Sequence, residues 1–207
     1  MNKLVKDALV LTCITVIAGA ALGLVYEITK APIAKAEADA LAKAYQTVFS
    51  DAASFGDLEG FDSAKATEIV QKAGYSDDTI DNCVTALDNS GNVLGYVITV
   101  TSSAGYGGKI TFSMGITNDK VINGYSITNI SETAGLGMKA RDEGEGTFSS
   151  QFINRNAEIF KVTKTGAHDS SEIDAISAAT ITSKAMTNGV NAGVTYFDSL
   201  VGGAANE

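Results

Sequence analysis

The segment from residue 82 to residue 129 contains four strand-like runs and reads NCVTALDNSGNVLGYVITVTSSAGYGGKITFSMGITNDKVINGYSITN. β-Branched and aromatic residues are concentrated in these runs, and polar turn sequences at 88–91 and 118–119 join two pairs of them. We therefore expect strands at Asn82–Leu87, Val93–Thr101, Ile110–Thr117 and Val121–Asn129. Short connections favour antiparallel pairing of successive strands. A further strand is expected at Glu158–Thr163.

Helical patterns flank this run of strands on both sides. Ala64–Ala73 predicts a short helix that follows a loop at Asp51–Asp62. After the strands, apolar residues recur at helical spacing at Ile181, Ala185, Met186, Val190, Val194 and Phe197. This second pattern predicts a helix that begins near Thr180. Strands in succession with helices before and after them predict an α+β fold, with a mainly antiparallel sheet flanked by helices.

The N-terminal part has the length and composition of a membrane anchor. No charged residue occurs from Ala8 to Tyr26, a run that would span about 28 Å as a helix, close to the thickness of a bilayer core. Lys3 and Lys6 precede the run, so the positive-inside rule predicts a cytoplasmic N-terminus and an extracytoplasmic domain. A cleaved signal peptide is the alternative, but the apolar run is too long for one.

The predicted organisation has five parts: a cytoplasmic N-terminus (1–7), a transmembrane helix (8–29), an amphipathic connecting helix (30–49), an extracytoplasmic domain (50–200) and a flexible tail (201–207). Gly19 and Gly23 lie on a stripe of small residues along the transmembrane helix. Because such stripes let helices pack closely within a bilayer, we expect neighbouring membrane subunits.

The composition of the chain excludes several classes of function. A net charge of −9 and a pI near 4.6 argue against nucleic acid or an anionic membrane surface as a partner. Cys13 and Cys83 are far apart, and His168 is the single histidine, so the spacing of a metal site or an iron–sulfur cluster is absent. No dinucleotide-binding glycine fingerprint follows a strand.

The stretch from Asp174 to Ser183 combines an acid, several small residues and three hydroxyl groups at the start of the last predicted helix. A helix N-terminus offers unpaired N–H groups and the positive end of the helix dipole, which together suit a phosphate. On local chemistry alone, the simpler interpretation is a helix cap formed by Thr180, Thr182 or Ser183.

The order of residues in this stretch adds a resemblance. Asp174-x-x-Ser177-Ala178-Ala179-Thr180 resembles the flavinylation motif Asp-x-x-Ser/Thr-Gly-Ala-Thr of FMN-binding domains in membrane redox complexes. In that family the last threonine carries FMN through a phosphoester, so the resemblance implies covalent FMN on Thr180. Ala178 replaces the usual glycine, which matters only if that position requires a positive φ.

Two further loops are similar to motifs of the same family. Gly105-Tyr106-Gly107-Gly108 matches its Gly-Tyr-Gly-Gly loop, and Gln151-Phe152 matches a later Gln-Phe pair. The string from Ser131 to Gly137 is similar to Ser-Glu-Thr-Pro-Gly-Leu-Gly, with Ala134 in the place of proline. The resemblance implies that the cofactor is bound by Asp174, Ser177, Ala178, Ala179, Thr182, Ser183, Glu132, Thr133, Gly135, Leu136, Gly137, Gly107 and Gly108.

Within this family the chain most resembles the G subunits of the Rnf ion-translocating ferredoxin:NAD oxidoreductase. The resemblance implies a component of a translocase that relays electrons one at a time, does not itself oxidise NADH or ferredoxin, and receives FMN from a flavin transferase. Three alternatives remain: the C subunit of the sodium-translocating NADH:quinone oxidoreductase, an anchored module that holds its ligand non-covalently, and a structural subunit without flavin.

Overall fold

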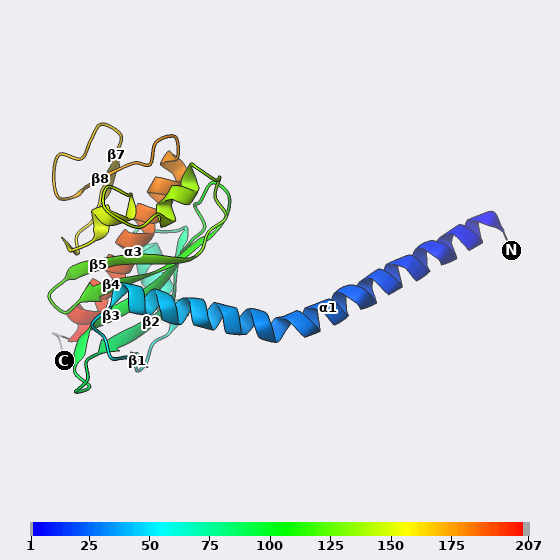
Figure 1. The fold of residues 1–207 in the computed structure, drawn as a ribbon, viewed down its shortest axis with the longest axis horizontal. Helices are drawn as coiled ribbons and strands as arrows, with labels where there is room; N and C mark the ends of the chain where they lie inside the picture. The colour runs from blue at the N-terminus through cyan, green and yellow to red at the C-terminus, as the bar shows by residue number, and fades with distance from the viewer. Residues whose placement is uncertain (1, 205–207) are drawn as a thin grey trace. The chain divides into compact units, whose positions relative to one another are not determined.

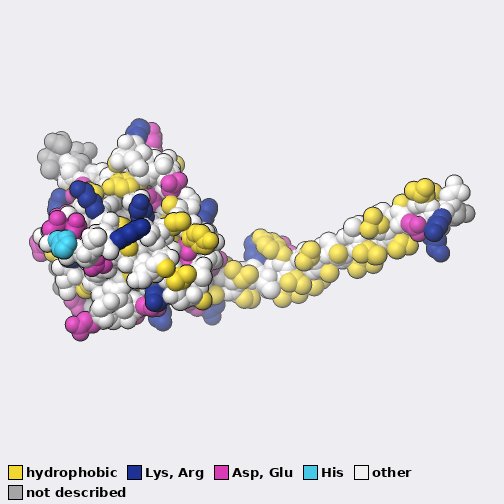
Figure 2. Space-filling view, turned by 90° about the horizontal axis from the view of Figure 1, so that it is seen from above, with side chains coloured by type: hydrophobic (Ala, Val, Ile, Leu, Met, Phe, Trp, Pro, Cys, Tyr) yellow, Lys and Arg dark blue, Asp and Glu magenta, His cyan; other side chains and the backbone are white. Residues whose placement is uncertain are grey.

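The computed structural model describes residues 2–204, and the chain divides into two units, 1–40 and 41–207. The first unit consists of the greater part of helix α1 (Lys3–Val48), whose side chains up to Ala40 are exposed except for partly buried Thr29. Figure 2 shows apolar side chains along this helix and basic side chains near its N-terminal end. Among the described residues α1 is the single helix long and apolar enough to cross a membrane, with a mean hydropathy of 2.5 over 18 residues. All residues of the predicted spans 8–29 and 30–49 except Phe49 lie in this one continuous helix, which contains Pro32.

The second unit is built on a six-stranded sheet with the order β1-β2-β3-β4-β5-β6, in which every neighbouring pair is antiparallel. Its strands are β1 (Ser54–Asp57), β2 (Asp78–Leu87), β3 (Val93–Ser102), β4 (Ile110–Thr117), β5 (Val121–Asn129) and β6 (Arg155–Asn156). The four consecutive strands expected from the sequence are β2 to β5, so the α+β prediction is confirmed.

Three details of the strand prediction are wrong. The expected loop at 51–62 contains β1, and β2 begins four residues before the expected start, at Asp78 instead of Asn82. The strand expected at Glu158–Thr163 is reduced to β7 (Lys161–Thr163), which pairs in parallel with β8 (Glu172–Asp174) in a separate two-stranded sheet. Strands as short as β1 and β7 are defined by their partners more than by their own sequence, which explains two of these errors.

Helix α3 (Thr180–Ala204) packs on one face of the sheet (Figure 1). Its Met186, Val190 and Phe197 are fully buried in a core shared with Phe112 and other apolar side chains of β2 to β5. The short helix α2 (Ser63–Lys72) joins the same core. Asp62 caps it, because its Oδ1 accepts the N–H groups of residues 64 and 65 at 3.0 and 3.2 Å.

The opposite face of the sheet is covered by the last turns of α1. Tyr45, Val48 and Phe49 form a second apolar cluster with Val84 and Val97. Successive side chains of a strand point to opposite faces, so Val97 joins this cluster whereas Ile98 joins the α3 core. The sheet therefore carries a helix on each face and leaves its loops free to form a site at one end.

Candidate functional site

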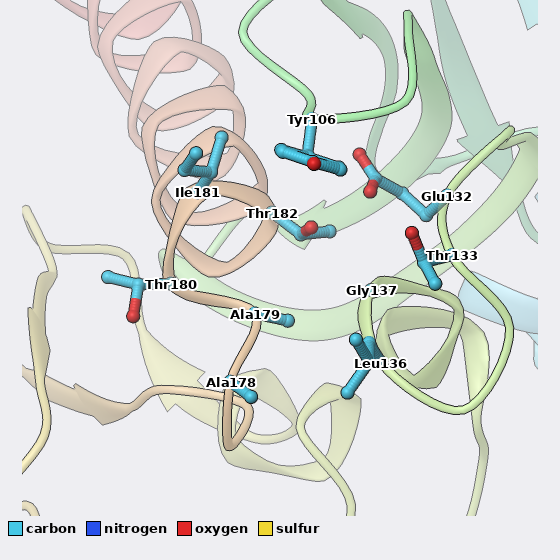
Figure 3. Close-up of a pocket in the computed structure, with 10 residues that line it drawn as sticks. All are labelled: Tyr106, Glu132, Thr133, Leu136, Gly137, Ala178, Ala179, Thr180, Ile181 and Thr182. Carbon is cyan, nitrogen blue, oxygen red and sulfur yellow. The ribbon is translucent and has the colours of Figure 1, made fainter.

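Three segments that are distant in the sequence line a cleft of about 520 Å³. They are the loop after β3, the loop after β5 with the 3-10 helix η1 (Gly137–Arg141), and the start of α3 (Figure 3). The lining residues are Tyr106, Glu132, Thr133, Leu136, Gly137, Ala178, Ala179, Thr180, Ile181 and Thr182. The fold thus brings three motifs that are separate in the sequence to one place.

Two glycines allow these segments to touch. A Cβ atom on Gly107 would lie 2.0 Å from the carbonyl oxygen of Ser131, and a Cβ atom on Gly137 would lie 2.6 Å from Thr182 Oγ1. Neither glycine has a positive φ, so it is the close approach of the neighbouring segment that requires glycine at both positions. These loops are therefore contact points rather than the flexible turns that glycine-rich loops often form.

Glu132 is the acidic group of the cleft. Glu132 is half-buried, and its Oε1 accepts the N–H of Gly107 at 3.2 Å. The side chain therefore links the loop after β5 to the loop after β3. Its Oε2 lies 2.7 Å from the position that a Cβ on Gly137 would take. In Figure 3 the carboxylate lies on the same side of the cleft as Tyr106, and the Thr182 side chain points toward it.

The loop between β5 and η1 has a fixed shape. The carbonyl oxygen of Thr133 accepts the N–H groups of Leu136 and Met138 at 3.1 and 3.2 Å. The η1 helix is tied to the sheet because the buried hydroxyl of Tyr125 donates to the carbonyl oxygen of Ala140 at 2.6 Å. Burial raises the pKa of Tyr125 well above its ordinary value, so this hydroxyl remains a donor.

The start of α3 supplies donors and free hydroxyl groups. The helix begins at Thr180, so the capping position falls on Ala179, which has no hydroxyl, and the simple interpretation as a hydroxyl cap is not what the structure shows. The first N–H groups of the helix, from Thr180 to Thr182, have no helical acceptor. Among residues 2–204, the hydroxyl groups of Thr180 and Thr182 have no hydrogen-bond partner.

Ser183 has a different position from the other two hydroxyl residues. Its side chain is fully buried, and its Oγ accepts the N–H of Ile176 and donates to the carbonyl oxygen of Ala179, both at 2.9 Å. Ser183 therefore fastens the turn that precedes α3 and does not line the cleft. Gly107, Gly108 and Gly135 likewise belong to the bordering loops without lining the cleft.

Ala178 has a backbone that favours glycine. Its φ is 62°, in the left-handed region, where an L-residue costs about 1 kcal/mol or more relative to glycine. The position therefore has the positive φ at which replacement of the usual glycine by alanine has a conformational cost. The exposed Ser177 and Ala178 form the tip of the loop between β8 and α3.

A second cleft, of about 370 Å³, lies beside the same loop and contains Asp174 and Ser177, the two motif residues that the first cleft lacks. Its other lining residues are Lys139, Asp142, Gly146, Thr147, Phe148, Gln151, Ala175 and Ile176. The residues of one sequence motif are therefore divided between two clefts, a division that the sequence gives no sign of.

The first cleft also has an apolar rim, only one residue of which was expected from the sequence. Tyr106 is 70% exposed, Ile181 is 52% exposed and Leu136 is 39% exposed. Of these, Tyr106 and Ile181 were not among the expected site residues. The available signal was the position of Tyr106 within the Gly-Tyr-Gly-Gly string. Ile181 was assigned to the apolar face of α3, but the structure leaves it outside the core.

Comparison with known protein families identifies the class of protein to which the chain belongs. Residues 105–195, which include all three cleft segments, match the FMN-binding domain family. Residues 1–48 match the family described as the RnfG N-terminal region. The chain is thus a protein with an FMN-binding domain and the N-terminal region of RnfG proteins.

Comparison over the whole chain identifies the family more closely. The chain is 33% identical over 197 residues to the G subunit of the Na⁺-translocating ferredoxin:NAD⁺ oxidoreductase complex of Acetobacterium woodii, with 94% of this chain and 92% of the relative covered. It is 28% identical to the G subunit of the ion-translocating oxidoreductase complex of Methanosarcina acetivorans, with 97% and 98% covered. The chain therefore belongs to the family of G subunits of ion-translocating oxidoreductase complexes. The crystal structure of Shewanella oneidensis NqrC is 20% identical, covers 60% of this chain and 62% of its own, and has a TM-score of 0.48.

Proposed function

We propose that the chain is the electron-relay component of a membrane-bound ion-translocating ferredoxin:NAD⁺ oxidoreductase complex, and that it carries FMN as a phosphoester on Thr180. The observation that carries this proposal is the position of Thr180. It is the first residue of α3, its hydroxyl has no hydrogen-bond partner among the described residues, and it lines the cleft where the three motifs meet.

The residues of the cleft fit the chemistry of FMN. The unpaired N–H groups of Thr180, Ile181 and Thr182 and the positive end of the α3 dipole suit the phosphate. The exposed apolar side chains at the rim suit an aromatic ring system, and Glu132 and Thr133 offer polar atoms for its edge. FMN would supply one-electron transfer chemistry, and the residues of the chain would bind, orient and electrostatically tune it.

Accessibility favours Thr180 over Thr182 as the acceptor. Thr182 is only 1% exposed, whereas Thr180 is partly exposed. In Figure 3 the Thr180 side chain points away from Glu132, and the Thr182 side chain points into the cleft. A flavin transferase must reach the acceptor oxygen, so the outward hydroxyl of Thr180 is the better substrate. The new bond joins Thr180 Oγ1 to the FMN phosphorus of FAD, the pyrophosphate bond breaks, AMP leaves, and the hydroxyl proton is released.

A covalent bond would also keep FMN on a domain that lies outside the cytoplasm. The apolar part of α1 follows Lys3 and Lys6, an arrangement that favours a cytoplasmic N-terminus and an extracytoplasmic domain. Free FMN would be dilute outside the cytoplasm, and a reversible site would lose it by mass action. The small-residue stripe with Gly19 and Gly23 would meet other membrane subunits of the complex.

The test is intact-mass analysis of the chain and two variants, produced in a host that contains the flavin transferase. The unmodified sequence should gain the mass of one FMN minus one water. Thr180→Ala should abolish the adduct, and the matched control Thr182→Ala should retain it. Retention of the full adduct by Thr180→Ala would contradict the assignment. Flavin that is released on denaturation would favour the non-covalent alternative.

A further inference from the structure

The backbone of Asp174, at the start of the loop that carries the acceptor, is held by a single side chain. Gln151 lies in the 3-10 helix η2 (Ser149–Phe152). Its Oε1 accepts the N–H of Asp174 at 2.7 Å, and its Nε2 donates to the carbonyl oxygen of Asp174 at 3.1 Å. One carboxamide thus satisfies both backbone groups of the residue that ends β8 and begins the flavinylation motif.

The rest of the loop has few other attachments. The N–H of Ala175 donates to the carbonyl oxygen of Thr163 at 2.8 Å, and the N–H of Ile176 donates to Ser183 Oγ at 2.9 Å. In the part of the chain that the structure describes, Ser177 and Ala178 form no backbone hydrogen bond, and Ala178 has its strained φ of 62°. A strained tip of this kind keeps its shape only if both ends of the loop are fixed. Gln151 fixes one end and Ser183 the other.

Gln151 is itself held in place by its neighbour. Phe152 is fully buried, and its ring contacts those of Tyr125, Phe148 and Phe160 with centroid separations of 5.5 to 5.6 Å. The η2 helix is therefore anchored in the main core, and the carboxamide of Gln151 projects from a rigid base to the edge of the second cleft. Rigid support of this kind is what accurate placement of a reactive group requires.

We propose that Gln151 is a positioning residue for covalent flavin attachment. It fixes the backbone of Asp174 so that the loop presents the Thr180 hydroxyl to the flavin transferase. The inference rests on the proposed function and assigns it a residue that lines the second cleft and not the first. Loss of this contact would slow flavin transfer to the folded chain, because a reacting group displaced by about 1 Å can lose up to roughly a hundred-fold in rate.

The chain contains a matched control for this interaction. Asn191 makes the same two-point contact with a different backbone residue: Phe160 donates its N–H to Asn191 Oδ1 at 2.8 Å, and Asn191 Nδ2 donates to the Phe160 carbonyl oxygen at 2.9 Å. Asn191 is 3% exposed, so the loss of its contact should cost at least as much stability as the loss of the Gln151 contact. Phe160, however, lies outside the acceptor loop.

The experiment compares Gln151→Met with Asn191→Leu, since both variants keep the size of the side chain and remove its hydrogen bonds. The full-length chains are made in a host without flavin transferase and purified in detergent. A purified transferase, FAD and Mg²⁺ are then added, and the FMN adduct is followed by intact mass. Circular dichroism and hydrogen exchange at the Asp174 N–H report the fold and the loop independently. If Gln151→Met does not fold, Gln151→Glu replaces it. This variant keeps the acceptor for the Asp174 N–H and loses the donor to the Asp174 carbonyl oxygen, so it should also slow the transfer.

We expect Gln151→Met to fold, to exchange the Asp174 N–H faster, and to accept FMN roughly ten-fold more slowly or worse. Asn191→Leu should be less stable but should accept FMN within about two-fold of the wild-type rate when folded. A wild-type rate for Gln151→Met, or equal slowing of both variants, would overturn the inference and leave the proposed function intact. Failure of the wild-type chain to accept FMN would overturn both.

Discussion

The two clefts beside the acceptor loop differ in character, although one sequence motif supplies residues to both. The first cleft has an apolar rim of Tyr106, Leu136 and Ile181 around a single carboxylate, and it includes the N-terminus of α3. The second has two carboxylates, of Asp142 and Asp174, and the Lys139 ammonium among hydroxyl and amide groups. The first suits an aromatic ring and a phosphate, whereas the second suits polar partners. Under the proposed function, this motif of seven residues would both bind the cofactor and present the acceptor hydroxyl to the flavin transferase.

The largest expected effect comes from forcing apart the loops that border the first cleft. Gly107→Ala would place a Cβ atom 2.0 Å from the Ser131 carbonyl oxygen, a backbone atom that cannot move freely. We expect a loss of about 2–3 kcal/mol in the free energy of unfolding, together with a shifted flavin absorption spectrum. The control is Gly146→Ala at the second cleft, where φ is 77° and no atom of the described residues lies within 4 Å of the new Cβ. That variant should lose about 1 kcal/mol and keep the spectrum. Equal spectral shifts would remove the distinction between the clefts.

One buried carboxyl group outside both clefts should make the free energy of unfolding depend on pH. Asp78 is 2% exposed and its Oδ1 has no hydrogen-bond partner among the described residues. Burial raises its pKa to about 6, although the nearby Ser102 hydroxyl opposes the shift. In the unfolded chain this carboxyl titrates near 3.8. Between these two values the folded chain binds more protons than the unfolded chain, so stability is greatest below the lower value and falls as the pH rises to about 6.

Asp78→Asn should therefore raise the free energy of unfolding at pH 7.5 by about 2 kcal/mol and flatten its dependence on pH between about 4 and 6. Thermal unfolding across this pH range is the measurement. Because Asp78 lines neither cleft, the flavin adduct should be unchanged. An unaltered pH profile would assign the titration to another group.

Much of the fold could be predicted because strands β2 to β5 are long, rich in β-branched residues and separated by turns, so local sequence and tertiary pairing agree. The short strands β1, β6 and β8 depend on their partners and could not be predicted. At the site, the motifs indicated which three segments of the chain come together. The left-handed φ of Ala178 and the place of Asp174 in the second cleft follow from the path of the loop, to which no local pattern points.

The contact between Gln151 and Asp174 could not be predicted from the sequence either. In the sequence Gln151 is recognisable only as part of a Gln-Phe pair, because a contact between residues 23 positions apart has no signature in either segment. Ser183 was expected at the cofactor because it ends the stretch from Asp174 to Ser183, whereas the structure buries it beneath the turn that precedes α3.

Removal of one carboxylate from each cleft should have the smallest effect, and it compares the influence of the two clefts on the flavin midpoint potential. A carboxylate near the flavin disfavours the anionic reduced form, so Glu132→Gln should raise the flavin midpoint potential by about 20–40 mV. Asp142→Asn removes the same charge from the second cleft and should leave the potential within roughly 10 mV, because it lines the other cleft and solvent screens it. Redox titration of the flavinylated chains distinguishes the two. Equal shifts would show that the flavin senses both clefts alike.

Peptide mapping of the native chain is the sharpest test of the proposed bond between Thr180 and the flavin. Cleavage after Lys164 and Lys184 releases one peptide that contains Thr180, Thr182 and Ser183. Fragmentation of this peptide by tandem mass spectrometry assigns the FMN mass to a single residue. We expect FMN on Thr180 and unmodified Thr182 and Ser183. FMN on Thr182, or a peptide without flavin from a chain that is yellow before digestion, would contradict it.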